Sequence, residues 1–252
     1  MKILIVEDEQ AIASGLKFNF EQEKYDVVVA GDGPTALDEI RQAASPFDVV
    51  ILDLMLPSMS GYETCREIRK IDSQVPVLVL SARTLSEDKA MAFDCGSDQY
   101  MTKPFALPEL LARVRNLTER HLPGSASGPA AGDDSSGQHT FGPVQIDFRK
   151  FEATVTSSDG KVETVPLTTT EAELLRYLIE HEGEVLSRVQ ILRDVWGHDA
   201  DVTTRTIDNF VMRLRKLLDT DAANSSHIRS VRGTGYQFVT HPEPPSPDES
   251  TA

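Results

Sequence analysis

The chain has 252 residues, enough for two domains that each bury a core of their own. Its formal net charge of −15 argues at first against nucleic-acid binding, because phosphate contacts need a basic surface. No apolar run approaches the roughly 18 residues of a membrane span, and none resembles a signal peptide, so we expect a cytoplasmic protein without membrane contact. Cys65 and Cys95 lack the spacing of a metal site and are expected to be free structural thiols.

The first 120 residues alternate between strand and helix patterns. Short apolar runs predict strands near residues 2–6, 25–30, 48–53, 76–81 and 98–102. Segments of helical period predict helices near residues 10–21, 33–44, 60–71, 85–95 and 106–120. Five strands in strict alternation with five helices predict a doubly wound α/β fold around a five-stranded parallel sheet.

Polar residues stand just past four of these apolar runs: Asp8, Asp53, Ser81 and Lys103. Because parallel sheets bind ligands outside the carboxyl ends of their strands, these side chains should converge at one edge. Clustered carboxylates repel one another and favour a hard divalent cation with oxygen ligands. Asp8 or Ser81 alone would more often be a cap or turn residue, but together the four predict a Mg2+-dependent phosphoryl acceptor.

A change of composition marks the domain boundary. After an amphipathic stretch from Leu107 to Leu117, the chain is rich in Gly, Ser, Pro and Ala between residues 122 and 137. The twelve residues from His241 are rich in Pro, Ser and acids. We therefore expect a first domain at residues 1–120, a flexible linker at 121–139, a second domain at 140–240 and a disordered tail at 241–252.

The second domain is predicted to be α+β. Alternating segments at residues 144–148 and 151–155 suggest a small antiparallel sheet, followed by three helices. Thr170 with Glu173, and Ser187 with Gln190, have the spacing of capping boxes ahead of the first two helices. The third helix should run from about residue 204 to 218.

The third helix and the hairpin after it carry local positive charge. On the helix, Ile207, Val211, Leu214 and Leu218 define an apolar stripe, and Phe210 at its edge is expected in the core. The face opposite the stripe holds Arg205, Asn209, Met212, Arg213 and Lys216, and Arg215 is a further candidate for DNA contact.

Residues 228–232 and 236–239 flank a glycine-containing turn with Arg232 near its tip, so the pattern is that of a winged helix-turn-helix. Taken alone, the basic helix face would be better explained as a solvated surface.

Five motifs resemble, in order and spacing, the receiver domain of bacterial response regulators. They are Val6-Glu7-Asp8-Glu9, Leu52-Asp53-Leu54-Met55-Leu56-Pro57, Ser58-Met59-Ser60-Gly61, Leu80-Ser81-Ala82-Arg83 and Tyr100-Met101-Thr102-Lys103-Pro104-Phe105. The resemblance covers residues 1–120 and implies the flavodoxin-like fold of that family.

This resemblance implies a phosphorylation site. Asp53 would accept a phosphoryl group from the phosphohistidine of a partner sensor histidine kinase. Asp8 and Asp53 would ligate Mg2+ directly, Glu7 would reach it through water, and Met55 would contribute its backbone carbonyl. The protein would not be an enzyme beyond catalysing its own aspartyl phosphorylation and dephosphorylation.

The same resemblance assigns the residues around the phosphoryl group. Lys103 would pair with phosphoryl oxygens, and Ser81 would hydrogen-bond one of them. Tyr100 would act as a switch that turns inward when Ser81 moves, and the Lys103-Pro104 bond would be cis.

The second domain resembles the effector domain of the OmpR/PhoB subfamily of response regulators. The matching motifs are Thr204-Arg205-Thr206-Ile207-Asp208-Asn209, Arg213-Leu214-Arg215-Lys216 and Val231-Arg232-Gly233-Thr234-Gly235-Tyr236. The resemblance implies that the third helix reads the major groove of promoter DNA, that the wing arginine enters the minor groove, and that RNA polymerase is a partner.

Members of this subfamily dimerise when phosphorylated, through the fourth helix, fifth strand and fifth helix. The residues of this face that the resemblance assigns are Lys89, Phe93, Asp98, Glu109, Ala112, Arg113 and Arg115. Gln99 replaces the aspartate that is usual beside the switch tyrosine, so the implied homodimer should be somewhat weakened.

Two rival functions stay open at this point. A phosphatase of haloacid-dehalogenase type also uses an Asp at a strand end with Mg2+, but it needs a general acid two residues later, where this chain has Met55. A DNA-binding protein that dispenses with phosphorylation is the second rival, weakened because no receiver motif residue is missing.

Overall fold

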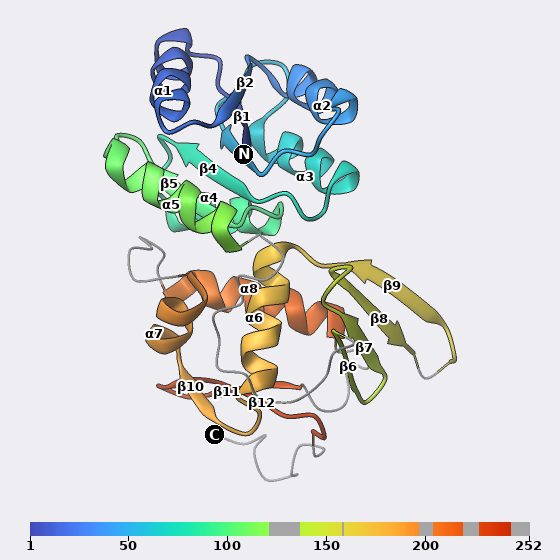
Figure 1. Ribbon diagram of the computed structural model, residues 1–252. Coiled ribbons are helices and arrows are strands. Elements are labelled where there is room, and N and C mark those ends of the chain that lie inside the picture. Colours follow the sequence, from blue (N-terminus) through green and yellow to red (C-terminus); the bar gives the residue numbers. More distant parts are fainter. Residues whose placement is uncertain (121–136, 158, 197–203, 219–226, 243–252) are drawn as a thin grey trace. The chain divides into compact units, whose positions relative to one another are not determined.

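The computed structural model describes residues 1–120, 137–157, 159–196, 204–218 and 227–242, which fall into two compact units (Figure 1). The predicted linker and tail lie mostly outside the described residues. The second unit begins earlier than expected, because its first strand starts at Gln138, inside the predicted linker. Within the described part of the chain, no helix has the length and apolar character needed to cross a membrane.

The first unit has the predicted alternation of strands and helices. Its strands are β1 (Lys2–Val6), β2 (Asp26–Ala30), β3 (Val49–Asp53), β4 (Val77–Ser81) and β5 (Gln99–Thr102). Its helices are α1 (Gln10–Gln22), α2 (Gly33–Gln42), α3 (Gly61–Ile71), α4 (Ser86–Asp94) and α5 (Leu107–Arg120).

All five strands are parallel, in the order β2-β1-β3-β4-β5. The middle strands β3 and β4 are buried along their whole length, which explains their unbroken apolar runs. One core cluster joins the sheet to α1 and α5, whereas α2 and α3 contact each other (Figure 1). The strand order reverses between β1 and β3, and it is at such a switch point that open α/β sheets place their sites.

The second unit contains two antiparallel sheets and a helix-turn-helix. Its strands are β6 (Gln138–Phe141), β7 (Val144–Asp147), β8 (Glu152–Thr156), β9 (Val162–Pro166), β10 (Val185–Ser187), β11 (Ile228–Val231) and β12 (Gly235–Phe238). Its helical segments are α6 (Thr169–Glu180), α7 (Arg188–Ile191), the π-helix η1 (Leu192–Trp196) and α8 (Thr204–Leu218). Strands β6 to β9 form one sheet in sequence order, and β10-β12-β11 form the other.

One local prediction for the helices needs correction, and a second is confirmed in part. The capping box of α6 is made by Thr168 and Glu171 rather than by Thr170 and Glu173, because the helix begins at Thr169 and Thr168 has the extended backbone of an N-cap. Ser187 does cap the second helix, by accepting from the Gln190 N–H, but the α-helix gives way to a π-helix after Ile191.

The third helix is confirmed as α8, with its apolar stripe buried. Ile207, Val211, Leu214 and Leu218 are all at most 1 % exposed. Phe210 is also in the core, where its ring meets Trp196 edge-on at 5.2 Å between centroids. Strands β11 and β12 form the predicted wing hairpin.

Candidate functional site

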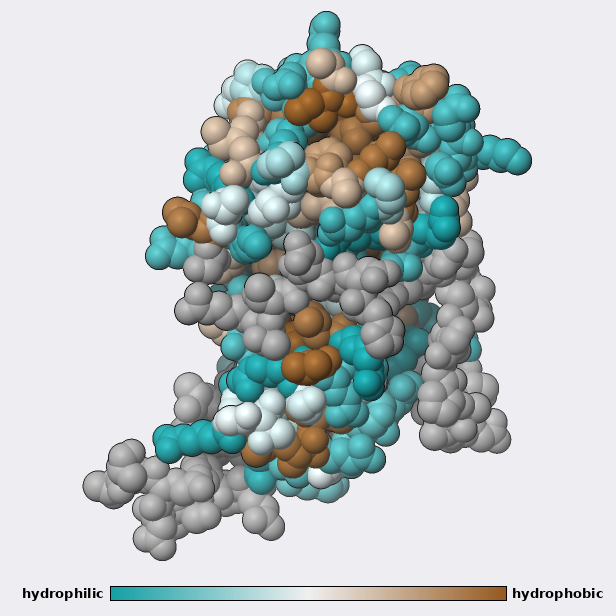
Figure 2. Space-filling view, turned by 90° about the vertical axis from the view of Figure 1, so that its left-hand side faces the viewer, coloured by the Kyte–Doolittle hydropathy of each residue, from teal (hydrophilic) through white to brown (hydrophobic). Residues whose placement is uncertain are grey.

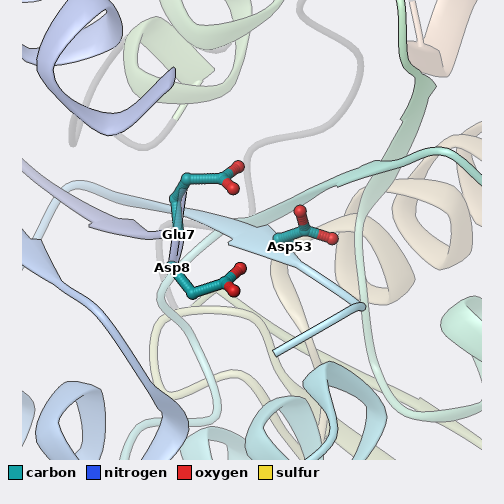
Figure 3. A group of neighbouring side chains, drawn as sticks. All are labelled: Glu7, Asp8 and Asp53. Atoms are coloured by element: carbon teal, nitrogen blue, oxygen red, sulfur yellow. The ribbon is translucent and has the colours of Figure 1, made fainter. Parts of the chain in front are cut away.

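Three carboxylates meet at the switch point of the first unit. Glu7 and Asp8 follow β1, and Asp53 is the last residue of the neighbouring strand β3. One oxygen from each lies within 4.8 Å of the others, and the side chains point to the same side of the sheet edge (Figure 3). Glu7 and Asp53 are 4 % and 5 % exposed, whereas Asp8 is exposed. The predicted convergence of these acids is therefore confirmed.

Lys103 compensates part of this negative charge. Its Nζ lies 2.6 Å from Glu7 Oε2 and 2.5 Å from Asp53 Oδ2. Burial acts to lower the pKa of Lys103, but the hydrogen bonds to Asp53 and Glu7 outweigh it and raise the pKa, so the ammonium stays charged. Burial raises the pKa of Glu7, although its hydrogen bond from Lys103 opposes the shift. The Lys103-Pro104 bond is cis, as expected.

The Asp53 carboxylate is held at both oxygens. Oδ2 accepts from Lys103, and Oδ1 accepts from the backbone N–H of Met55 at 2.8 Å. Gly61 packs so closely beneath this loop that a Cβ there would lie 2.2 Å from the Asp53 carbonyl oxygen. The loop after β3 and the start of α3 thus fix the direction in which Asp53 points.

Ser81 and Tyr100 lie at the same end of the sheet. Ser81 is fully buried as the last residue of β4, one position past the residue paired with Asp53, and its Oγ accepts from the Arg83 N–H at 3.2 Å. Tyr100 is 3 % exposed and donates its hydroxyl to the Arg83 carbonyl at 2.8 Å. Burial is the main cause that raises the pKa of Tyr100. The tyrosine is therefore in an inward position, tied to the loop that follows Ser81.

A further set of contacts at the rim was not predicted. Arg83 Nη1 lies 2.8 Å from Asp88 Oδ1, and its Nε lies 3.4 Å from the Met55 sulfur. Asp88 also accepts from the Tyr62 hydroxyl at 3.2 Å, and burial together with Asp88 raises the pKa of Tyr62 to about 12. These contacts link the loops after β3 and β4 to the first turn of α4.

The predicted DNA-contact residues of the second unit fall into two groups. Met212 and Lys216 of α8 and Arg232 of the wing turn are exposed, and Asn209 is partly exposed. Arg213 is instead paired with Glu171 of α6 at 2.7 Å, as an ion pair rather than an aligned hydrogen bond. Arg205 lies in α8, but its side chain is outside the described residues.

Arg215 also makes internal contacts. Its guanidinium donates twice to the Ile228 carbonyl, at 2.8 and 2.6 Å, and once to Ser230 Oγ at 2.9 Å. It thereby holds β11 of the wing against α8. The DNA contacts of all these residues stay predictions. Arg213 was expected on the outer face but is paired with Glu171, and Arg215 is engaged with the wing.

Comparisons with known proteins agree with both halves of this geometry. Residues 3–115 match the family described as response regulator receiver domain, and residues 162–238 match the family described as transcriptional regulatory protein, C terminal. The chain is 41 % identical over 236 residues to the sensory transduction protein RegX3 of Mycolicibacterium smegmatis, which covers 94 % of this chain and 98 % of that protein. RegX3 of Mycobacterium tuberculosis is 40 % identical over 240 residues, with the same coverage.

The chain belongs to the response regulators of the OmpR/PhoB subfamily. It is a DNA-binding transcription regulator of a two-component system, with a receiver domain and a winged-helix domain. A solved structure of a RitR mutant shares the fold, with a TM-score of 0.76 at 23 % identity over 95 % of this chain and 99 % of that one.

Two residues assigned to the dimer face of the receiver domain are placed otherwise than predicted. Asp98 is 1 % exposed, because its carboxylate accepts from Arg69 at 2.7 Å and from the Val77 N–H at 2.8 Å. It therefore secures the start of β5 and is not a surface charge. Phe93 is 2 % exposed and so does not form part of an exposed apolar patch.

The other charges of that face already have partners within the receiver domain. Arg113 pairs with Glu109 one helical turn earlier at 2.7 Å, and Arg115 approaches Glu23 at 3.4 Å. The Nζ of Lys89 lies 5.7 Å from the centroid of the Tyr100 ring. Ala112 is partly exposed.

The winged-helix domain contains a polar cluster that was not predicted. Asp208 of α8 accepts from Arg188 Nε at 2.8 Å and from the Tyr236 hydroxyl at 2.6 Å. The Arg188 guanidinium stacks over the Tyr236 ring at 4.8 Å. The cluster joins α7, α8 and β12. No spacing rule finds it, because its members are 20 and 28 residues apart.

Proposed function

We propose that phosphorylation of Asp53 controls DNA binding by this response regulator, with a sensor histidine kinase as the phosphodonor. The observation that carries the proposal is the pairing of Lys103 with Asp53 among three clustered carboxylates. The Asp53 carboxylate is held in a fixed direction. Glu7 and Asp8 add two further carboxylates to the single cation Lys103, so the site has an excess of negative charge.

The proposed reaction is a transfer between two side chains. An oxygen of Asp53 attacks the phosphorus of the kinase phosphohistidine, and the phosphorus–nitrogen bond breaks with its electron pair going to the imidazole, which takes up a proton. Lys103 can stay near the new phosphoryl oxygens as a charged ammonium, since its pKa is raised. Ser81 lies one residue past the β4 partner of Asp53, and we propose that it hydrogen-bonds the phosphoryl group.

The residues of the site fit a Mg2+ ion. Asp8 and Asp53 would supply hard oxygen ligands to the ion, the Met55 carbonyl would add a third, and Glu7 would reach it through water. Among the described residues, none forms an ion pair with Asp8, so its charge is available to a cation. When bound, Mg2+ supplies positive charge that offsets the charge of the incoming phosphoryl group.

The surface of the receiver domain supports a protein donor. Figure 2 shows hydrophobic surface gathered on the side of this domain where Figure 1 draws α1 and α5. Helix α1, which begins directly after the acidic residues, exposes the Phe18 side chain by 61 %. Exposed apolar surface of this kind marks sites of protein contact. We propose that phosphorylation then favours a homodimer, which binds promoter DNA and contacts RNA polymerase.

The experiment is labelling by a small phosphodonor. The protein is incubated with acetyl phosphate and Mg2+, and the phosphorylated residue is mapped by mass spectrometry. Wild type should take up one phosphoryl group on Asp53, with no uptake in Asp53→Asn, because the amide has the same shape but is a poor nucleophile. Asp38→Asn, a matched change at an exposed acid, should label normally. Uptake at another residue in wild type would refute Asp53 as the phosphoryl acceptor. Labelling that survives removal of Mg2+ would refute the requirement for this ion.

A further inference from the structure

The exposed side of α8 includes one large apolar side chain that the core does not use. The apolar residues of the stripe and Phe210 are buried, as described above, but Met212 is 56 % exposed. A single exposed methionine is common on protein surfaces, and by itself it has no functional meaning. The polar residues beside Met212 on the helix suggest a functional role for it.

Met212 lies in a strip with Asn209 and Lys216, which we call the outer strip of α8. At 100° per residue these three positions fall within about 60° of one another around the helix axis. Lys216 is exposed and Asn209 is partly exposed. The outer strip therefore offers an amide, a flexible apolar chain and a cation, in that order along the helix.

Two of the arginines of α8 that were predicted to contact DNA are engaged elsewhere. Arg213 is paired with Glu171, and its guanidinium lies 5.9 Å from the Phe210 ring centroid. Moving it to a base edge would leave the Glu171 carboxylate without this cation. Arg215 makes three hydrogen bonds to the wing, and all three would have to break. The usual partner of guanine in the major groove is an Arg or Lys that is free to form two hydrogen bonds.

We infer that α8 reads an adenine–thymine pair, with Asn209 at the adenine edge and Met212 against the thymine methyl group. This inference rests on the proposed function, because it requires that α8 enters the major groove. Asn forms hydrogen bonds with N6 and N7 of adenine, and apolar side chains contact the thymine methyl group. Asn209 and Met212 therefore both favour an adenine–thymine base pair. Lys216, at the end of the outer strip, contacts a backbone phosphate. Methionine suits this contact because its unbranched chain adapts to the shape that it meets.

The test begins with the selection of DNA sites from a random pool by the full-length protein treated with acetyl phosphate. Each thymine of the selected site is then replaced by deoxyuridine, which lacks only the methyl group. Wild type should lose about fourfold in affinity at one thymine, the loss expected for one buried methyl-sized group. Met212→Ala should be indifferent to the same replacement, and Met212→Leu should keep part of the sensitivity. Val162→Ala, which removes another exposed apolar side chain from β9, should behave as wild type.

Asn209 is tested on the same selected site. Replacing the adenine with 7-deazaadenine removes the N7 acceptor, and this should weaken wild type but not Asn209→Ala. The inference is overturned if wild type ignores the methyl group at every thymine, or if Met212→Ala remains as sensitive as wild type. The inference is also overturned if Arg213→Ala loses base preference, with unchanged thermal stability, while Met212→Ala and Asn209→Ala keep it. A pool that yields no preferred sequence would contradict this inference and the proposed DNA-binding function together, whereas the other outcomes leave the proposed function intact.

Discussion

A single lysine sets the charge balance at the proposed phosphorylation site. Lys103 contacts Glu7 and Asp53 at once, while Asp8 stays exposed outside the ion pairs. One positive charge against three carboxylates leaves the site able to attract a cation, yet keeps Asp53 in a defined orientation. The site therefore combines a carboxylate of fixed direction, the proposed nucleophile Asp53, with unsatisfied negative charge.

Gly61 is the residue on which this orientation depends most directly. A Cβ at Gly61 would lie 2.2 Å from the Asp53 carbonyl oxygen and 2.5 Å from Leu54 Cα, and neither backbone atom can yield easily. We expect Gly61→Ala to lower the free energy of unfolding by on the order of 1–3 kcal/mol. It should also slow labelling of Asp53, because the loop after β3 has to shift.

The matched control is Gly15→Ala, measured in the same thermal unfolding and labelling assays. Gly15 is exposed in the middle of α1 with nothing within 4 Å of its Cβ position. Alanine there should stabilise the helix by about 0.5–1 kcal/mol and leave labelling unchanged. Equal effects of the two substitutions would show that the close approach at Gly61 does not matter.

The sequence was sufficient to predict which side chains converge at the proposed acceptor site, but not the contacts around them. Asp8, Asp53 and Ser81 follow apolar strands, so their convergence follows from the order of strands in a parallel sheet. The link from Arg83 to Asp88 depends instead on side-chain rotamers and on where α4 begins. For the same reason a helical wheel placed Arg213 on the outer face, although its long side chain turns to Glu171.

At the scale of elements, predictability follows how strongly burial marks the chain. Strands β3 and β4 are buried throughout and were predicted to within a residue. Strands β6 and β9 were missed, since β9 is exposed along most of its length and carries no alternation. The cap of α6 was misplaced because Thr168, Thr169 and Thr170 are all suitable caps by type, and only the backbone decides between them.

Helix α8 combines a structural arginine with an exposed lysine, and the two should respond differently to substitution. Arg215→Ala removes three hydrogen bonds to the wing, so we expect a loss of on the order of 1–3 kcal/mol in the free energy of unfolding. Lys216→Ala should leave stability unchanged but lower the slope of log affinity for DNA against log salt by about one unit. Thermal unfolding and salt titrations of DNA binding distinguish the two roles. An unaltered salt slope in Lys216→Ala would remove this lysine from the phosphate contacts.

At the scale of the whole molecule, a net charge of −15 is compatible with DNA binding because the positive charge is local. The exposed cations Lys216 and Arg232 lie on the third helix and the wing turn of the winged-helix domain. Much of the remaining charge repels DNA. Binding of DNA by a single protomer should accordingly be weak and sensitive to salt. A dimer that binds two repeated sites at once would compensate for this weak affinity.

The proposed dimer can be tested through Lys89. The resemblance to the subfamily pairs Lys89 with Glu109 of the other protomer. Reversing the charge in Lys89→Glu should weaken the phosphorylated dimer in sedimentation experiments, because both symmetry-related copies of this proposed pair are lost and each contributes at most about 1 kcal/mol. Lys70→Glu, the same change at an exposed position of α3, is the control and should dimerise as wild type. Dimers of equal strength in both variants would show that the face built from α4, β5 and α5 is not used.

Control of the affinity for DNA is the role proposed for a phosphoryl group on Asp53. The most direct measurement is the dissociation constant for a selected site at fixed salt, before and after treatment with acetyl phosphate and Mg2+, in wild type and in Asp53→Asn. Wild type should bind roughly 5- to 150-fold more tightly after treatment, the usual range of coupling between two sites, and Asp53→Asn should not change. An equal gain in both proteins, or no gain in wild type that is phosphorylated on Asp53, would show that this phosphoryl group does not control DNA binding.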